Sequence, residues 1–104
     1  MQRLAFKMKL NKGQVAEYKR RHNALWPELK ALLKAAGIYN YSIFFDEETH
    51  LLFAFQVVEN SEGSQALGEE AIVQKWWKYM SDIMETNDDY SPVSVPLEEV
   101  FYLE

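Results

Sequence analysis

The hydrophobic period changes several times along the chain, and this change constrains the fold most. Residues 4–10 alternate apolar and polar side chains, which is the period of a half-buried strand. Apolar residues then recur at steps of three and four from Val15, which predicts an amphipathic helix ending at Gly37. Pro27 lies inside this pattern. Because a proline disfavours helical geometry in the residue before it, we expect a second helical segment to begin there.

The next two segments read as a hairpin. Residues 38–45 and 51–58 are rich in β-branched and aromatic residues, and a short acidic turn separates them. Side chains alternate between the two faces of a strand. Strict alternation would put these four residues on one face of the first strand: Tyr39, Tyr41, Ile43 and Phe45.

A second helical region and a closing strand complete the predicted elements. The better half of the helical region covers residues 69–84, and residues 97–103 are expected to form a short strand. Polar side chains precede both helical regions. Asn11, with Gln14 three residues later, is expected to cap the first region, and Ser61 is expected to cap the second. The inward side of the second helix should carry Ile72, Val73, Trp76, Met80, Ile83 and Met84.

The predicted order is therefore strand, helix, strand, strand, helix, strand. This is the βαββαβ pattern of the ferredoxin-like α+β fold, an antiparallel sheet with both helices on one face, here in one domain over residues 1–104. Aromatic residues are abundant on the face that the helices leave open. An apolar sheet face of this kind predicts a partner, so we expect a homodimer packed through the sheets. The residues concerned are Phe44, Phe53, Phe55, Phe101 and Tyr102.

Composition excludes several classes of function. Eleven Lys and Arg against 16 Asp and Glu give a net charge of −5 without a basic run, which disfavours nucleic acids and anionic membranes as partners. The chain has no cysteine, so thiolate metal sites and thiol nucleophiles are excluded, and no carboxylate spacing suggests a metal site. No signal peptide and no apolar run of about 18 residues is apparent, so we expect a cytoplasmic protein.

Tyr18 and His22 lie four residues apart on the inward stripe of the first predicted helix. A phenol and an imidazole conflict with an apolar stripe, and such conflicts tend to mark functional sites. A lone histidine is more often satisfied by a backbone carbonyl, but His22 belongs to the polar run 20–23 beside the predicted helix break, where a ligand could reach it. Its ordinary pKa of about 6.5 allows proton donation and acceptance near neutral pH. His50 follows an acidic turn and is expected to be solvated.

Trp76 and Trp77 are adjacent in the second predicted helix. Neighbouring helical residues point about 100° apart, so both indoles cannot fill one core position. We expect one in the core and the other at a pocket wall or a dimer contact, although two packing tryptophans are an equally good interpretation. Aromatic faces of this size suit weakly polar ligands, including the C–H faces of sugars.

Two sequence runs resemble the signatures of the L-rhamnose mutarotase family. YKRRHN at 18–23, followed by LWPEL at 25–29, is similar to the first-helix signature of that family, and QKWWKYM at 74–80 is similar to its second-helix signature. Weaker matches cover the second strand and the C-terminal segment of the family. The resemblance extends over nearly the whole chain, but residues 59–73 match no signature. The weaker matches are residues 39–43, 91–94 and 99–103.

The resemblance implies a dimeric α+β barrel of ferredoxin-like protomers. It also implies cofactor-free interconversion of the α and β anomers of L-rhamnose, a small-molecule sugar substrate, in the cytoplasm. Carried over by position, it makes His22 the proton donor. The residues that would bind the sugar are Tyr18, Tyr41, Trp76 and Trp77.

This chemistry suits the residue types. Opening a pyranose ring needs a proton at the ring oxygen and the loss of one from the anomeric hydroxyl, with no nucleophile or redox group. The base stays open between Tyr18 and a bound water. Two other classes also remain: the same barrel hosts cofactor-less monooxygenases and isomerases, and a non-enzymatic module could bind sugar without accelerating anomer exchange.

Overall fold

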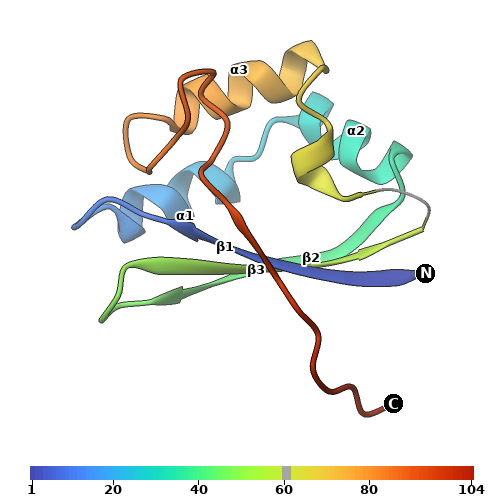
Figure 1. Ribbon diagram of the computed structural model, residues 1–104. Helices are drawn as coiled ribbons and strands as arrows, with labels where there is room; N and C mark the ends of the chain where they lie inside the picture. The colour runs from blue at the N-terminus through green and yellow to red at the C-terminus, as the bar shows by residue number, and fades with distance from the viewer. Residues whose placement is uncertain (60–61) are drawn as a thin grey trace.

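The elements follow the predicted order, and a short 3₁₀ turn precedes the last helix (Figure 1). The structure, a computed structural model, describes residues 1–59 and 62–104; the cap expected at Ser61 lies outside the described residues. No helix in these two ranges is long and apolar enough to cross a membrane. The elements are β1 (Gln2–Lys9), α1 (Val15–Asn23), α2 (Pro27–Ala35), β2 (Ile38–Asp46), β3 (Leu51–Val58), the 3₁₀ turn η1 (Ser64–Ala66), α3 (Ala71–Met80) and β4 (Val95–Leu97).

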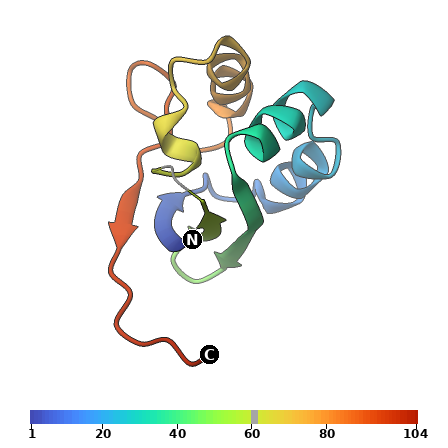
Figure 2. The ribbon, with the colours of Figure 1, turned by 90° about the vertical axis from the view of Figure 1, so that its right-hand side faces the viewer.

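The four strands form one antiparallel sheet in the order β2-β3-β1-β4. All helices cover the same face of this sheet, and the other face carries no helix (Figures 1 and 2). This arrangement confirms the predicted ferredoxin-like α+β fold. The core lies between the two layers, where β1 and β3 contribute alternate residues and α3 contributes one face. It is centred on Phe6, Met8, Leu52, Ala54, Val73, Trp76, Met80 and Ile83.

The helix break at Pro27 is confirmed. Trp26 has extended backbone angles, φ −60° and ψ 130°, and Pro27 occupies the first position of α2. The end at Gly37 is confirmed as well, since this glycine has a left-handed φ of 77° two residues after the last residue of α2. The break separates α1 from α2 and leaves His22 in the last turn of α1.

The cap predicted at Asn11 is wrong. A separate turn precedes the helix. In this turn the backbone N–H of Gln14 donates to the carbonyl oxygen of Asn11 at 3.2 Å. Gln14 therefore becomes the residue before α1, and its side chain makes no capping bond. The side-chain amide of Asn11 instead donates to the carbonyl oxygen of Asp82 at 3.3 Å, and this bond connects the end of β1 to the turn after α3.

A β-bulge in β2 changes which tyrosine faces the helices. The pairing register shifts between Tyr39 and Ser42, so that Asn40 and Tyr41 together oppose the single residue Gln56 of β3. Asn40 takes a left-handed φ of 49°, which asparagine tolerates better than most residues. The prediction that Tyr39 and Tyr41 share a face is therefore wrong: Tyr39 turns to the open face, and Tyr41 packs against the core.

The second helix is shorter than predicted, because α3 ends at Met80 and a turn follows. In that turn the Ile83 amide donates to the Met80 carbonyl oxygen at 3.1 Å. The predicted inward residues keep their role across the turn. Ile72 is half-buried, and the others are buried: Val73, Trp76, Met80, Ile83 and Met84.

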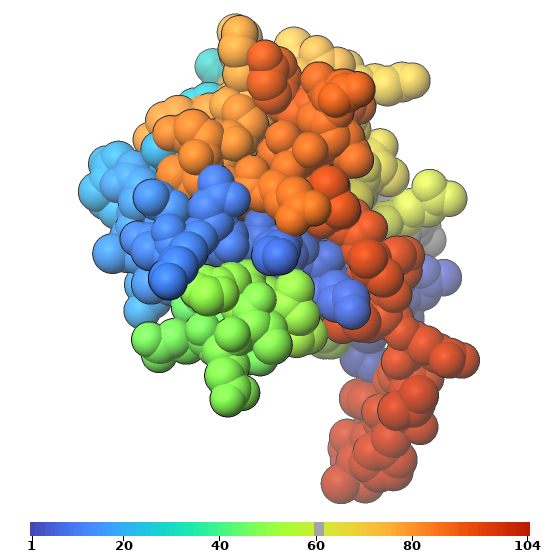
Figure 3. All heavy atoms as spheres, turned by 60° about the vertical axis from the view of Figure 1, so that its left-hand side comes forward, coloured from blue at the N-terminus to red at the C-terminus, as the bar shows by residue number. Residues whose placement is uncertain are grey.

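The closing strand is also shorter and begins earlier than predicted. β4 pairs with β1 only over Val95–Leu97, with Leu97 opposite Ala5. Continuing this register would place residues 98–100 opposite Leu4, Arg3 and Gln2, but the pairing ends at Leu97. Residues 98–104 have no regular structure; Glu99 and Tyr102 contact the Arg3 side chain, and the end of the tail extends beyond the body of the protein (Figure 3).

Candidate active site

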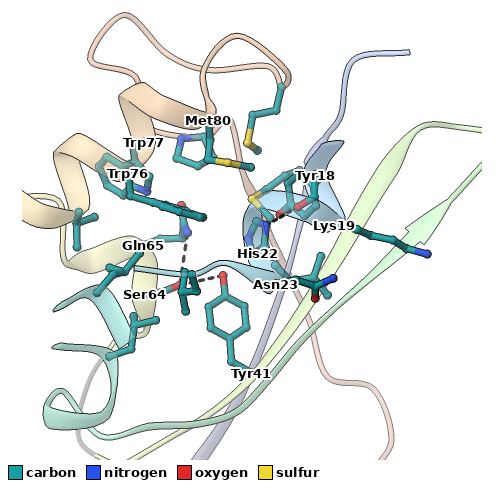
Figure 4. Close-up of a pocket in the computed structure, with 18 residues that line it drawn as sticks. Tyr18, Lys19, His22, Asn23, Tyr41, Ser64, Gln65, Trp76, Trp77 and Met80 are labelled. Carbon is teal, nitrogen blue, oxygen red and sulfur yellow. Dashed lines mark hydrogen bonds between the residues drawn. The ribbon is translucent and has the colours of Figure 1, made fainter. Parts of the chain in front are cut away.

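A cavity of about 440 Å³ lies between the sheet and the helices, within the usual range of roughly 300–1,000 Å³ for small-molecule sites. Its walls come from α1, α3, β2 and η1. All five site residues predicted from the sequence line it. In Figure 4, Trp76 and Trp77 lie on one side, Tyr18 and His22 on the other, and Tyr41 rises from the sheet between them.

His22 is held in place by Tyr18, one turn earlier in α1. The imidazole stacks on the phenol ring with 4.2 Å between the ring centroids and an interplanar angle of 25°. Its Nδ1 lies 3.0 Å from the carbonyl oxygen of Tyr18. A carbonyl oxygen can only accept, so Nδ1 carries the hydrogen and donates it. Nε2 of the neutral ring then keeps its lone pair for a ligand.

Burial determines the charge of this ring. Removal from water lowers the pKa of His22 below its ordinary value near 6.5, and the bond to the Tyr18 carbonyl only partly opposes that effect. His22 is therefore neutral at pH 7. Burial likewise raises the pKa of Tyr18, with a further contribution from the nearby Tyr41, so that the phenol keeps its proton.

Trp76 fixes the other side of His22. Its indole meets the imidazole edge-on, with centroids 5.4 Å apart and an interplanar angle of 88°. Trp26, the residue at the helix break, packs edge-on against the same indole at 5.1 Å. Each such contact stabilises the arrangement by about 0.5–1.5 kcal/mol beyond area burial. The break at Pro27 thus supplies the aromatic residue that supports Trp76.

Trp77 packs against Gly68, in the segment between η1 and α3. A Cβ atom at Gly68 would lie 2.9 Å from Cη2 and 3.0 Å from Cζ3 of the indole, closer than carbon atoms approach. The glycine therefore makes room for the indole. Trp76 and Trp77 are both buried and both line the cavity, so the prediction that one fills the core and the other the pocket wall is too simple.

Tyr41 belongs to a polar cluster in the cavity floor. The Ser64 hydroxyl lies 3.4 Å from the Tyr41 hydroxyl (Figure 4). Behind it the Gln56 amide bonds Ser64 twice: Nε2 donates to Oγ, and Oε1 accepts from the backbone N–H at 3.1 Å. Gln56 has no exposed surface. Burial raises the pKa of Tyr41, so this phenol is protonated as well.

The site offers no cluster of metal ligands. Across residues 1–59 and 62–104, no group of three or more His, Asp or Glu side chains could hold a metal ion. What the cavity combines is one neutral imidazole, two protonated phenols and two indoles, which suits proton transfer on an uncharged ligand with apolar C–H faces.

Comparison with known proteins assigns the family. A model of the family described as L-rhamnose mutarotase matches residues 3–103. The chain is 65% identical to the L-rhamnose mutarotase of Formosa agariphila and 61% identical to that of Bacteroides thetaiotaomicron, over the full length of every chain. The crystal structure of an L-rhamnose mutarotase from Formosa agariphila superposes with a TM-score of 0.91 at 62% identity, again over both full lengths.

The chain belongs to the L-rhamnose mutarotase family.

Mutarotases are carbohydrate isomerases that interconvert anomers, and the cavity of this L-rhamnose mutarotase family member is lined largely by aromatic and apolar side chains, which suit the C–H faces of a sugar. Three other residues considered in the sequence lie apart from this cavity. His50 does not line the cavity. Arg20 bonds Glu17, and Arg21 bonds Glu17, Asp82 and the Tyr79 carbonyl, so neither guanidinium turns toward the ligand space.

Sequence reasoning missed several cavity residues of this family member. Ser64 and Gln65 come from the stretch 59–73, which matched no signature, and Lys19 and Asn23 lay inside a motif without a role of their own. Gln56 gave a signal that could have been used. It is the one polar residue in the inward row of β3, which otherwise reads Leu52, Ala54 and Val58.

Proposed function

We propose that the chain interconverts the α and β anomers of L-rhamnopyranose in this cavity and that His22 moves the proton. One observation carries the assignment of His22. Its Nδ1–H is already committed to the Tyr18 carbonyl at 3.0 Å, so that Nε2 is the ring nitrogen left for a ligand in the cavity. An imidazole fixed in one tautomer between two aromatic rings is prepared for proton transfer without reorganising.

The lowered pKa of His22 suggests the order of events. The resting imidazole is neutral, so its Nε2 first accepts the proton of the anomeric hydroxyl while the bond between C1 and the ring oxygen breaks. The resulting imidazolium donates that proton to the ring oxygen, which yields the open aldehyde. Rotation about C1–C2 and the reverse transfers close the ring as the other anomer. His22 is then both the base and the proton donor, and no proton is gained or lost overall.

The phenols take supporting roles in this scheme. Tyr18 was one of two candidates for the base, but its raised pKa keeps it protonated, so it is better suited to donate a hydrogen bond. We propose that Tyr18 and Tyr41 bind sugar oxygens and that Trp76 and Trp77 contact the C–H faces of the ring. A positioned acid and base contributes roughly 10²–10⁴ in rate, or about 3–5 kcal/mol of barrier.

His22→Asn tests the proposal. Saturation-transfer NMR on L-rhamnose measures anomer exchange, and calorimetry measures sugar binding. We expect exchange to fall by at least about 100-fold, in line with the loss of one acid–base group, while binding persists. The matched control is His50→Asn, outside the cavity at a left-handed φ of 62° that asparagine tolerates, which should exchange normally. Unchanged exchange in His22→Asn would refute the role of His22, and binding without exchange in the wild type would favour a sugar-binding module.

The assembly and location complete the proposal. We propose that residues 1–104 form one domain that pairs with a second copy through the open face of the sheet, giving a dimeric α+β barrel in the cytoplasm, where the resemblance implies L-rhamnose is metabolised. The exposure of Phe44 (68%), opposite the partly exposed Phe53 (36%), supports this pairing. The tail supports it too, because Val100, Phe101 and Leu103 are at least 78% exposed. Cell fractionation tests the location.

A further inference from the structure

We propose that Gln56 and Ser64 form a positioning pair that fixes Tyr41 as a hydrogen-bond donor toward the sugar. The inference rests on the proposed function, since it concerns how the same cavity binds its substrate. Gln56 is fully buried in an apolar strand row, where an amide has to be satisfied by specific partners. Both of its polar atoms meet Ser64, a residue in the wall of the cavity.

The orientation of the Gln56 amide follows from the backbone. The Ser64 N–H can only donate, and its partner 3.1 Å away must therefore be the carbonyl oxygen, Oε1. The Nε2 of the same amide then faces the Ser64 hydroxyl and donates to it. Both ends of the amide are bonded to Ser64, and the same Gln56 side chain also bonds the Tyr41 hydroxyl, so the amide cannot flip without losing these bonds.

The direction of these hydrogen bonds determines the direction of the bond between Ser64 and Tyr41. Because Ser64 Oγ accepts from Gln56, and from Gln65 Nε2 at 3.4 Å, its single hydrogen is free to be donated. The Tyr41 hydroxyl oxygen lies 3.4 Å away and accepts it. Tyr41 therefore has its own O–H left over, and this O–H points to the cavity, where it meets an acceptor lone pair on the sugar.

The bulge in β2 makes this chain of donors possible. With regular pairing Tyr41 would follow the alternation of Tyr39 and turn to the same face as that residue, which is the open one. The extra residue at Asn40 brings Tyr41 opposite Gln56 instead, on the inner face. Gly63 permits the approach of η1 to the same spot, because a Cβ there would lie 2.7 Å from Gln56 Oε1. Bulge and glycine thus bring three polar side chains from separate elements together.

A double-mutant cycle tests the proposal: Ser64→Ala, Tyr41→Phe and the double variant, each assayed for L-rhamnose exchange and for sugar binding. Loss of one directed hydrogen bond should raise KM about threefold to tenfold in Ser64→Ala, with kcat nearly unchanged because the bond serves ground state and transition state alike. In the Tyr41→Phe background the same Ser64→Ala change should have little further effect. Gln56→Met, of similar volume, should reproduce the KM rise.

The controls separate the possible failures. Ser81→Ala removes a hydroxyl that donates to the Lys78 carbonyl at 2.7 Å, outside the cavity, and should leave KM unchanged. Effects of Ser64→Ala and Tyr41→Phe that multiply in the double variant would overturn the positioning pair, as would a fall in kcat at constant KM. If the wild type binds L-rhamnose without exchanging its anomers, the proposed function fails, but the cycle can still be read from the binding constants.

Discussion

The imidazole ring of His22 is stacked on the phenol ring of Tyr18, and His22 Nδ1 donates to the backbone carbonyl oxygen of Tyr18. The spacing of four residues in α1 produces both contacts, because side chains one turn apart lie above one another and the Tyr18 carbonyl points along the helix toward the turn that holds His22. The position and the tautomer of the imidazole are therefore set by the helix itself. Only the charge of the ring stays variable, and it responds to pH.

We expect anomer exchange to persist to lower pH than a solvent-exposed imidazole would allow. Burial lowers the pKa of His22, and the neutral ring is the resting form in the proposed reaction. The sign is therefore that kcat/KM declines as pH falls and the imidazolium accumulates, with the decline displaced to lower pH than for an ordinary imidazole. A pH profile of kcat/KM by NMR, together with titration of the His22 ring protons against N-acetylhistidine, measures both quantities.

The opposite sign would contradict this account. If only the imidazolium were active, exchange would rise as pH falls through the pKa of His22. The ring signals are assigned by their absence in His22→Asn, which separates them from those of His50. A profile that is flat from pH 5 to 9 with a clear His22 titration would mean that the ring does not take part in proton transfer.

Local patterns predicted most of the fold and drew attention to Tyr18, His22, Trp76 and Trp77, whereas Tyr41 was proposed as a site residue only through the family resemblance. The period changes located the elements, Pro27 and Gly37 located the helix ends, and the conflict of Tyr18 and His22 with an apolar stripe pointed to the cavity. These signals are local, because they depend on backbone preferences and on which face of one element a residue occupies. The family could be recognised from the sequence for the same reason, because the residues of its two main signature motifs lie on helices.

The parts that were missed depend on contacts between distant segments. The left-handed Asn40 displaces Tyr39, and no single-strand pattern signals where a bulge will occur. The bond of Asn11 to Asp82 replaces a cap and requires the turn after α3. Residues 98–104 do not continue the ladder with β1, and Glu99 instead bonds the Arg3 side chain. Each of these three features is decided by contacts between distant segments in the folded protein.

Gly68→Ala should displace the Trp77 indole. A methyl group at that position would lie 2.9 Å from Cη2, and either the ring or the segment before α3 must move. Overpacking of this kind costs about 1–3 kcal/mol of unfolding free energy. We expect a lower unfolding midpoint, an altered tryptophan emission spectrum and a higher KM for L-rhamnose, measured by denaturant titration, fluorescence and NMR.

The double variant Gly68→Ala/Trp77→Phe is the control for this prediction. A phenyl ring lacks the outer ring atoms that the new methyl group would meet. The stability cost of Gly68→Ala should therefore shrink when Trp77 is already Phe. An equal cost in both backgrounds would show that the glycine serves the backbone and not the indole.

Arg21→Lys should destabilise the protein, whereas the same change at Arg20 should not. The Arg21 side chain is only 9% exposed, and its guanidinium reaches Asp82, Glu17 and the Tyr79 carbonyl, joining α1 to the end of α3. A lysine cannot make this forked set of bonds, so we expect a loss of about 1.5–3 kcal/mol. The same change at Arg20, which is 64% exposed and paired with Glu17, should leave the free energy of unfolding nearly unchanged. Chemical denaturation of both variants measures the difference, and equal costs would contradict it.

Phe44→Glu should weaken self-association. In the proposed homodimer the open sheet face is buried against a second copy, and a carboxylate on that face would lose its water without gaining a partner. We expect the dimer dissociation constant to rise at least about 10-fold, which corresponds to about 1.4 kcal/mol. Sedimentation velocity over a range of concentrations measures it.

The control, Tyr90→Glu, alters an aromatic residue that is 43% exposed in the loop after α3 and should leave association unchanged. A Phe44→Glu protein that associates like the wild type would exclude the sheet face as the interface, and a monomeric wild type would refute the homodimer itself.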